Sequence, residues 1–150
     1  MRTNARMEKG IICAMRDLIE NSHSLLGLKL TAAQCGAFEK YEQLLVEWNE
    51  RINLTAIDNP EEIRSKHFLD SLTCLKVMRD TAMERIIDVG TGAGFPGIPI
   101  KILYPGVQLT LVDSVGKKTD FCRHVVQELR LEGVQIIQER AEAIGQLPLH

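Results

Sequence analysis

The sequence contains no uninterrupted apolar run approaching the ~18 residues that a membrane-spanning helix needs. Its N-terminus has a short basic start, but Arg16 and Asp17 interrupt the apolar stretch that a signal peptide would require. The charged fraction is 25% of the 150 residues, which is typical of a soluble globular protein. We therefore expect a cytoplasmic protein that has no membrane partner.

The cysteines form no CxxC pair and have no histidine at metal-ligand spacing. They are Cys13, Cys35, Cys74 and Cys122. Isolated cysteines of this kind are typical of buried thiols in a reducing cytosol. The sequence also lacks an obvious nucleophile with a neighbouring base. We expect no metal site.

Residues 1–80 are predicted to form a helical region. Apolar residues recur at helical spacing from Met7 to about Glu20, and a loop is expected over residues 21–30. Thr31 and Gln34 fit a capping box at the start of the next helix. A connector is expected over residues 49–57, followed by a further helical region to about Met78.

Residues 81–150 are predicted to form the first half of a parallel α/β sheet. Short strands are expected at residues 85–89, 107–113 and 134–137, and helices at 98–104 and 116–131. This alternation is typical of right-handed crossovers between parallel strands, and the first strand is expected to be buried. The fold class expected is α/β and Rossmann-like, with three strands behind an N-terminal helical region.

A glycine-rich loop follows the first predicted strand. The stretch IIDVGTGAGFPGIPI has four glycines in the eight residues from Gly90 to Gly97. In parallel sheets, ligands bind beyond the carboxyl ends of the strands. Bare backbone lets a ligand approach closely, and the next helix presents the amides of its N-terminus. The loop therefore indicates a cofactor site.

Two cofactors fit the loop in two different registers. Residues 92–97 spell GxGxxG, with Asp113 about 20 residues later, as in dinucleotide sites. Residues 88–94 spell DxGxGxG, which resembles motif I of S-adenosylmethionine-dependent methyltransferases. A carboxylate before the first glycine suits an ammonium group and would repel a pyrophosphate. We favour S-adenosylmethionine; a nicotinamide dinucleotide and a turn without ligand remain alternatives.

Several stretches together resemble the bacterial small-subunit ribosomal RNA methyltransferases once called glucose-inhibited division protein B. They are WNERINLTAI, KHFLDSL, DVGTGAGFPGIPIKI, LVDSVGKKTDF and ERAEAI. Their order agrees with the family across nearly the whole chain from about Phe38. The resemblance implies methylation of N7 of a guanine, with S-adenosylmethionine as the cofactor. It also implies 16S ribosomal RNA or the small ribosomal subunit as the partner, and we expect a monomer.

The resemblance also implies a set of cofactor-binding residues. They are Asp88, Gly90, Gly92, Gly94, Phe95, Asp113, Ala141 and Glu142. Gly90 and Phe95 would line the pocket, and Ala141 with Glu142 would contact the adenine end. Asp113 would bind the ribose, and Asp88 the methionine amino group, directly or through water. From the residues alone, Phe95 could equally be a core aromatic and Glu142 a solvated carboxylate.

Four residues are candidates for contact with RNA. His67 and Asp70 lie three residues apart on a predicted helix, where a surface pair is the alternative interpretation. Lys117 and Lys118 follow the end of the second strand and could contact phosphates. The net charge of -2 neither favours nor excludes an RNA partner.

The chemistry implied by the resemblance requires no general base. Guanine N7 carries a lone pair and no proton, so the methyl group is transferred by an in-line displacement. Catalysis then depends on proximity, alignment and a polar environment that tolerates positive charge. We therefore name no catalytic residue.

Members of this family continue past the position of His150 into a fourth strand. We therefore expect a truncated methyltransferase whose turnover is reduced or absent, with one flank of the first strand exposed. The alternative is a noncatalytic module that still binds the cofactor or ribosomal RNA. A dehydrogenase is a third hypothesis.

Overall fold

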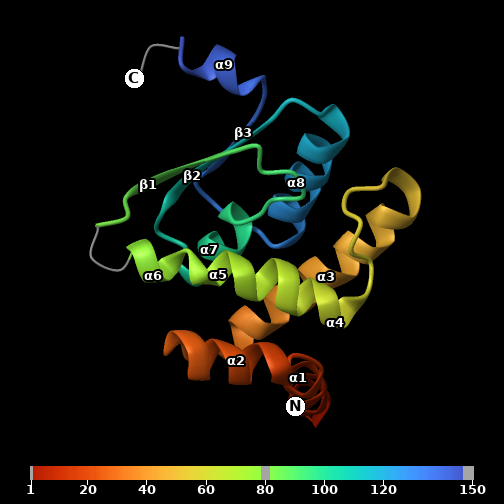
Figure 1. Ribbon diagram of the computed structural model, residues 1–150. Helices are drawn as coiled ribbons and strands as arrows, with labels where there is room; N and C mark the ends of the chain where they lie inside the picture. The colour runs from red at the N-terminus through yellow and green to blue at the C-terminus, as the bar shows by residue number, and fades with distance from the viewer. Residues whose placement is uncertain (1, 79–81, 147–150) are drawn as a thin grey trace.

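The computed structural model describes residues 2–78 and 82–146, and it has the expected order of helices followed by a sheet (Figure 1). The first part comprises α1 (Arg2–Ala14), α2 (Arg16–Leu26), α3 (Ala32–Ile52), α4 (Pro60–Glu62), the π-helix η1 (Ile63–Leu69), α5 (Asp70–Thr73) and α6 (Leu75–Met78). The second part comprises β1 (Arg85–Val89), α7 (Gly97–Leu103), β2 (Gln108–Asp113), α8 (Gly116–Glu128), β3 (Val134–Gln138) and α9 (Ala141–Ile144). The predicted fold class is confirmed.

The three strands are parallel and lie in the order β1-β2-β3. Val89 pairs with Val112, and Asp113 pairs with Gln138, so the three carboxyl ends meet at one edge. Because the strands are adjacent in chain order, right-handed crossovers put α7 and α8 on the same face (Figure 1). This arrangement leaves the carboxyl edge open to a ligand.

The first strand is less buried than the sequence predicts. Asp88 points toward α7, whereas Ile87 and Val89 are 53% and 50% exposed on the opposite face. Among the described residues β1 pairs only with β2, so its other flank is an open edge, as expected. An apolar run alone does not reveal which face of a strand a helix will cover.

The beginning of the chain differs from the prediction. Two helices, α1 and α2, replace the single helix expected to about Glu20, and α2 extends over the first six residues of the predicted loop, to Leu26. Ser22 is fully buried between Leu18 and Leu26 on one face of α2, which ends at Gly27 in the left-handed conformation with φ 65°. Because Ser22 is polar, the buried face of α2 is not a continuous apolar stripe, and apolar periodicity alone does not predict the full helix.

The capping box at the start of α3 is confirmed. Thr31 Oγ1 accepts from the Gln34 amide, and Gln34 Oε1 accepts from the Thr31 amide. The helix then continues to Ile52, four residues into the predicted connector, and is capped by Asn53, where φ is 39°. Further on, residues 63–69 form a π-helix, where an ordinary helix is expected.

One hydrophobic core joins the helical part to the sheet. It includes Phe38 and Tyr41 of α3, Phe68 of η1, Ile98 of α7 and Phe121 of α8, all with no exposed surface. The predicted boundary at residues 80 and 81 lies outside the described residues. None of the helices in residues 2–78 and 82–146 is both long and apolar enough to cross a membrane.

The cysteines agree only in part with the expectation of buried thiols. Cys35 and Cys122 are buried and free, whereas Cys74 is free and half-buried. The side chain of Cys13 lies outside the described residues.

Candidate functional site

The loop between β1 and α7 is held against the end of β2. The amides of Gly90 and Thr91 both donate to the Val112 carbonyl, at 2.8 and 3.0 Å. Gly90 and Gly92 have φ of 74° and 59°, which favours glycine. A Cβ atom at either position would meet no atom within 4 Å. The backbone at these two glycines therefore has open space beside it, where a ligand could approach.

The other two glycines of the loop are required by packing. A Cβ atom at Gly94 would lie 2.7 Å from Tyr41 Oη and 2.5 Å from Ile98 Cδ1. A Cβ atom at Gly97 would lie 2.6 Å from Leu111 Cδ2 and 2.9 Å from Asp88 Oδ2. The four glycines thus serve two purposes, since only Gly90 and Gly92 have open space beside them.

Asp88 anchors the loop to the start of α7. Its Oδ2 accepts from Thr91 Oγ1 at 2.8 Å and from the Gly97 amide at 2.9 Å. Burial raises the pKa of Asp88, the hydrogen bonds from Thr91 and Gly97 act against this, and Asp113 adds to it. Among the described residues Oδ1 has no hydrogen-bond donor, so one oxygen of the carboxylate remains for another partner.

Asp113 links the same loop to the turn before α8. Its Oδ2 accepts from the Gly92 amide and its Oδ1 from the Val115 amide, both at 2.9 Å. The residue is 7% exposed. Each carboxylate oxygen has a second lone pair, so the fixed carboxylate can still accept hydrogen bonds from hydroxyl groups.

A cavity of about 550 Å³ opens at the carboxyl edge of the sheet. It is lined by Val89, Gly90, Val112, Asp113, Ser114, Glu139, Arg140, Ala141 and Glu142. Its size lies within the range of small-molecule sites, and its walls come from the ends of all three strands. Four predicted site residues meet here: Gly90, Asp113, Ala141 and Glu142. Asp88, Gly92, Gly94 and Phe95 do not line it.

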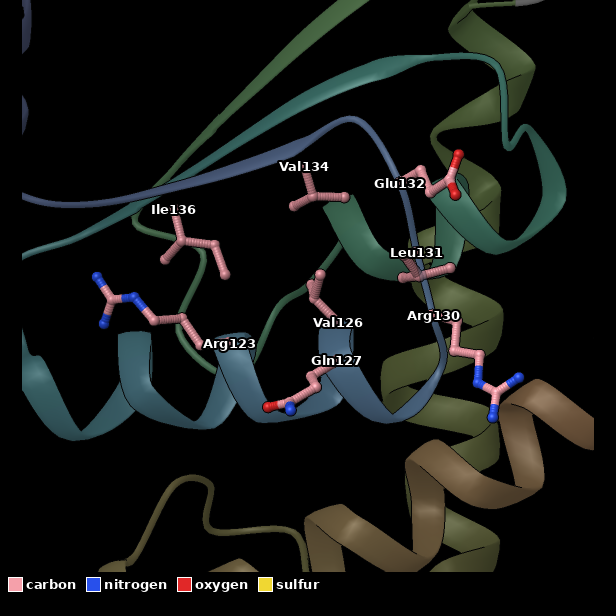
Figure 2. Close-up of a pocket in the computed structure, with 8 residues that line it drawn as sticks. All are labelled: Arg123, Val126, Gln127, Arg130, Leu131, Glu132, Val134 and Ile136. Atoms are coloured by element: carbon pink, nitrogen blue, oxygen red, sulfur yellow. The ribbon is translucent and has the colours of Figure 1, made fainter.

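A second groove lies elsewhere on the sheet and shares no residue with this cavity. Figure 2 shows it between α8 and β3, with Val126 and Val134 facing each other and Arg123 and Arg130 at its two ends. It contains none of the predicted site residues, and it is not the candidate cofactor site.

Phe95 and His67 stack on each other beside the glycine loop. Their rings are parallel within 2°, with centroids 4.4 Å apart. His67 Nε2 lies 2.9 Å from Thr55 Oγ1, and the Ile57 amide donates to the same Thr55 oxygen. Burial lowers the pKa of His67, and Asp70 acts against this. A neutral imidazole is therefore held on the face of Phe95.

The other residues predicted to contact RNA lie at the surface. Asp70 is exposed at the start of α5, Lys117 is exposed, and Lys118 is half-buried in the first turn of α8. None of them lines the cavity at the carboxyl edge.

Two residues of this site were missed by the sequence analysis. The Tyr41 hydroxyl donates to the Ala93 carbonyl, and the Cys122 thiol donates to the Gly92 carbonyl at 3.4 Å. The sequence assigns Tyr41 no role in the site, and it predicts Cys122 only to be a buried thiol. No local signal reveals a contact between residues 52 positions apart.

The parallel sheet, its crossover helices and the loop after β1 define a Rossmann-like methyltransferase fold. Residues 34–148 match the family model for GidB, the rRNA small subunit methyltransferase G. The chain belongs to this family.

Individual relatives carry the name ribosomal RNA small subunit methyltransferase G. The protein from Desulforamulus reducens is 51% identical over 121 residues, which are 81% of this chain and 50% of the relative. The protein from Alkaliphilus oremlandii is 43% identical over 132 residues, which are 88% of this chain and 55% of the relative. The protein from Roseiflexus castenholzii is 48% identical over 124 residues, which are 83% of this chain and 53% of the relative. The chain spans about half the length of these relatives.

Proposed function

We propose that the protein is an S-adenosylmethionine-dependent methyltransferase that acts on N7 of a guanine in 16S ribosomal RNA. The observation that carries the proposal is the cavity at the carboxyl edge, where the glycine loop, Asp113 and the start of α9 meet. The relatives' name supports the substrate class. We also expect the protein to work as a monomer in the cytoplasm, without a metal.

The described residues fit S-adenosylmethionine. We assign the ribose hydroxyls to Asp113, whose carboxylate is already fixed by two amides. The adenine end would lie near Ala141 and Glu142, and the remaining oxygen of Asp88 would accept from the methionine amino group, directly or through water. The open space beside Gly90 and Gly92 leaves room for the ligand to lie against bare backbone.

The residues of the chain then bind and orient rather than exchange protons. When bound, the cofactor supplies a methyl group on a sulfonium. Guanine N7 has no proton to lose, so none of the residues is needed as a base. The stacked rings of Phe95 and His67 lie beside the loop, and the neutral state of His67 adds no charge that would repel a cationic purine.

We assign contact with RNA to the helical region of residues 1–80 and the start of α8. His67 and Asp70 come from the first, and Lys117 and Lys118 from the second. Residues 81–150 would supply the part of the site that binds S-adenosylmethionine. The ammonium groups of the two lysines suit phosphate groups, whose binding weakens as salt rises.

Nucleoside analysis tests the proposal. The chain is incubated with small ribosomal subunits and methyl-labelled S-adenosylmethionine, and the RNA is digested. Because we expect turnover by this chain to be reduced or absent, any label that it transfers should lie in 7-methylguanosine. Label in a different nucleoside would contradict the assignment to N7. A chain that binds the cofactor but transfers no label would favour the alternative, a noncatalytic module. Binding of a nicotinamide dinucleotide instead would overturn the cofactor class.

A further inference from the structure

We propose that Tyr41 is a positioning residue for the cofactor loop, because its hydroxyl holds the Ala93 carbonyl and thereby sets the conformation of residues 92–94. The identity of the ligand rests on the proposed function. Tyr41 lies in α3, a helix of the N-terminal region, whereas the loop lies between β1 and α7. The helical region would therefore have a direct part in cofactor binding.

The Tyr41 side chain has the properties of a permanent donor. It has no exposed surface, and burial raises its pKa well above the usual value, with Cys122 and Asp88 adding to this. The phenol thus keeps its proton and donates to the Ala93 carbonyl.

Neighbouring rings fix the position of that hydroxyl. The Tyr41 ring stacks on Phe68 with centroids 5.2 Å apart and on Phe95 with centroids 5.4 Å apart. The hydroxyl lies so close to Gly94 that a Cβ atom there would be 2.7 Å from it. The absence of a side chain at Gly94 is therefore what allows Tyr41 to reach the loop.

The two carbonyls at the centre of the loop depend on side chains for their hydrogen bonds. The Thr91 carbonyl accepts from the amides of residues 94 and 95, and the Gly94 carbonyl accepts from the Ile98 amide. Within the described residues, the carbonyls of Gly92 and Ala93 accept only from Cys122 and Tyr41. Removing the Tyr41 hydroxyl leaves a buried carbonyl without a donor, which is unfavourable, so the loop will relax.

Relaxation of the loop should weaken the binding of the cofactor. If only part of the population keeps the competent conformation, the apparent dissociation constant rises by the inverse of that fraction. Tyr41→Phe retains the ring and its stacking and removes only the hydroxyl. A competent fraction of about one in five to one in ten gives a five- to tenfold weaker apparent affinity.

Calorimetric titration with S-adenosylmethionine tests this on the wild type, Tyr41→Phe and Leu45→Val. Leu45 lies four residues further along α3 and is fully buried, so Leu45→Val loosens the core without touching a loop carbonyl. We expect five- to tenfold weaker binding for Tyr41→Phe and unchanged binding for Leu45→Val at a temperature where both are folded. Equal affinities of wild type and Tyr41→Phe would overturn the proposal.

Hydrogen exchange without ligand separates this proposal from the proposed function. Tyr41→Phe should speed exchange of the Gly92 and Gly94 amides about tenfold, whereas Leu45→Val should not change their rate relative to the rest of the chain. Cys122→Ala, which removes the other side-chain donor, should act in the same direction. A wild type that binds no S-adenosylmethionine would refute the cofactor, and unchanged exchange in Tyr41→Phe would refute the role of Tyr41.

Discussion

At the scale of single residues, the glycines of the chain differ in whether there is room for a side chain at their positions. Gly97 lies where β2 and Asp88 approach the start of α7, and a methyl group there would collide with Leu111 Cδ2 and Asp88 Oδ2. At Gly106, by contrast, a Cβ atom would meet nothing within 4 Å. These two positions form a matched pair for testing close packing at the loop.

Gly97→Ala should lower the free energy of unfolding by about 2 kcal/mol, because the added methyl group overpacks a buried contact. Gly106→Ala should change it by less than about 0.5 kcal/mol. Urea denaturation followed by circular dichroism measures both. Equal stabilities of the two variants would contradict the close approach of Asp88 and Leu111 to Gly97.

At the scale of elements, a buried ion pair joins α3 to η1. Arg64 Nη1 lies 3.1 and 3.0 Å from the two carboxylate oxygens of Glu42, and the two side chains are only 16% and 11% exposed. Burial raises the pKa of Glu42 above its usual value, and the Arg64 charge acts against this. Glu47 and Arg51 of α3 form an ion pair with 58% and 76% of their side chains exposed, which provides a control.

Glu42→Gln should therefore destabilise the protein by about 2 kcal/mol, since Arg64 would keep a poorly solvated charge without its counter-ion. Glu47→Gln should change the free energy of unfolding by less than about 0.5 kcal/mol. Urea titration of both variants measures the difference. Similar effects of the two substitutions would show that the Glu42–Arg64 pair behaves as a surface pair.

The π-helix η1 carries His67, whose neutral form the fold favours. Burial lowers the pKa of His67 below its usual value of 6.5, although Asp70 acts against this. The unfolded chain therefore binds more protons just below pH 6.5, and stability falls as the pH drops from about 7 to about 5. His67→Phe keeps a ring against Phe95 and removes the titration.

We expect the fall in stability between about pH 7 and pH 5 to be smaller in His67→Phe than in the wild type. Urea midpoints measured across this range for both proteins give the comparison. Identical pH dependence in the two proteins, or a steeper fall in the variant, would mean that His67 is not held neutral by the fold.

Local signals predicted most of the elements. The capping box at Thr31, the alternation of strands and helices, and the glycine loop at the end of β1 all depend on nearby residues. The extent of α2 could not be predicted in this way, because Ser22 is polar and is buried only by tertiary packing. The π-helical turns of η1 have no comparable sequence signature.

At the scale of the whole molecule, the helical region and the sheet act as one core, with α3 reaching the loop through Tyr41. The position of the cavity followed from strand order, since the carboxyl ends of parallel strands meet at one edge. The hydrogen bonds of Asp88 could not be predicted from strand order, because the amide of Gly97 and the hydroxyl of Thr91 approach its Oδ2 only in the folded chain.

We propose that the cavity at the carboxyl edge binds S-adenosylmethionine through Asp113. Calorimetric titration of the 150-residue chain with S-adenosylmethionine, and with NADH for comparison, measures this binding. We predict binding of S-adenosylmethionine alone, weakened about 10- to 100-fold in Asp113→Ala through loss of charge-assisted hydrogen bonds. Asp120→Ala, at an exposed acid of α8, should bind as the wild type does. Preference for NADH, or full affinity in Asp113→Ala, would contradict this assignment of the cavity.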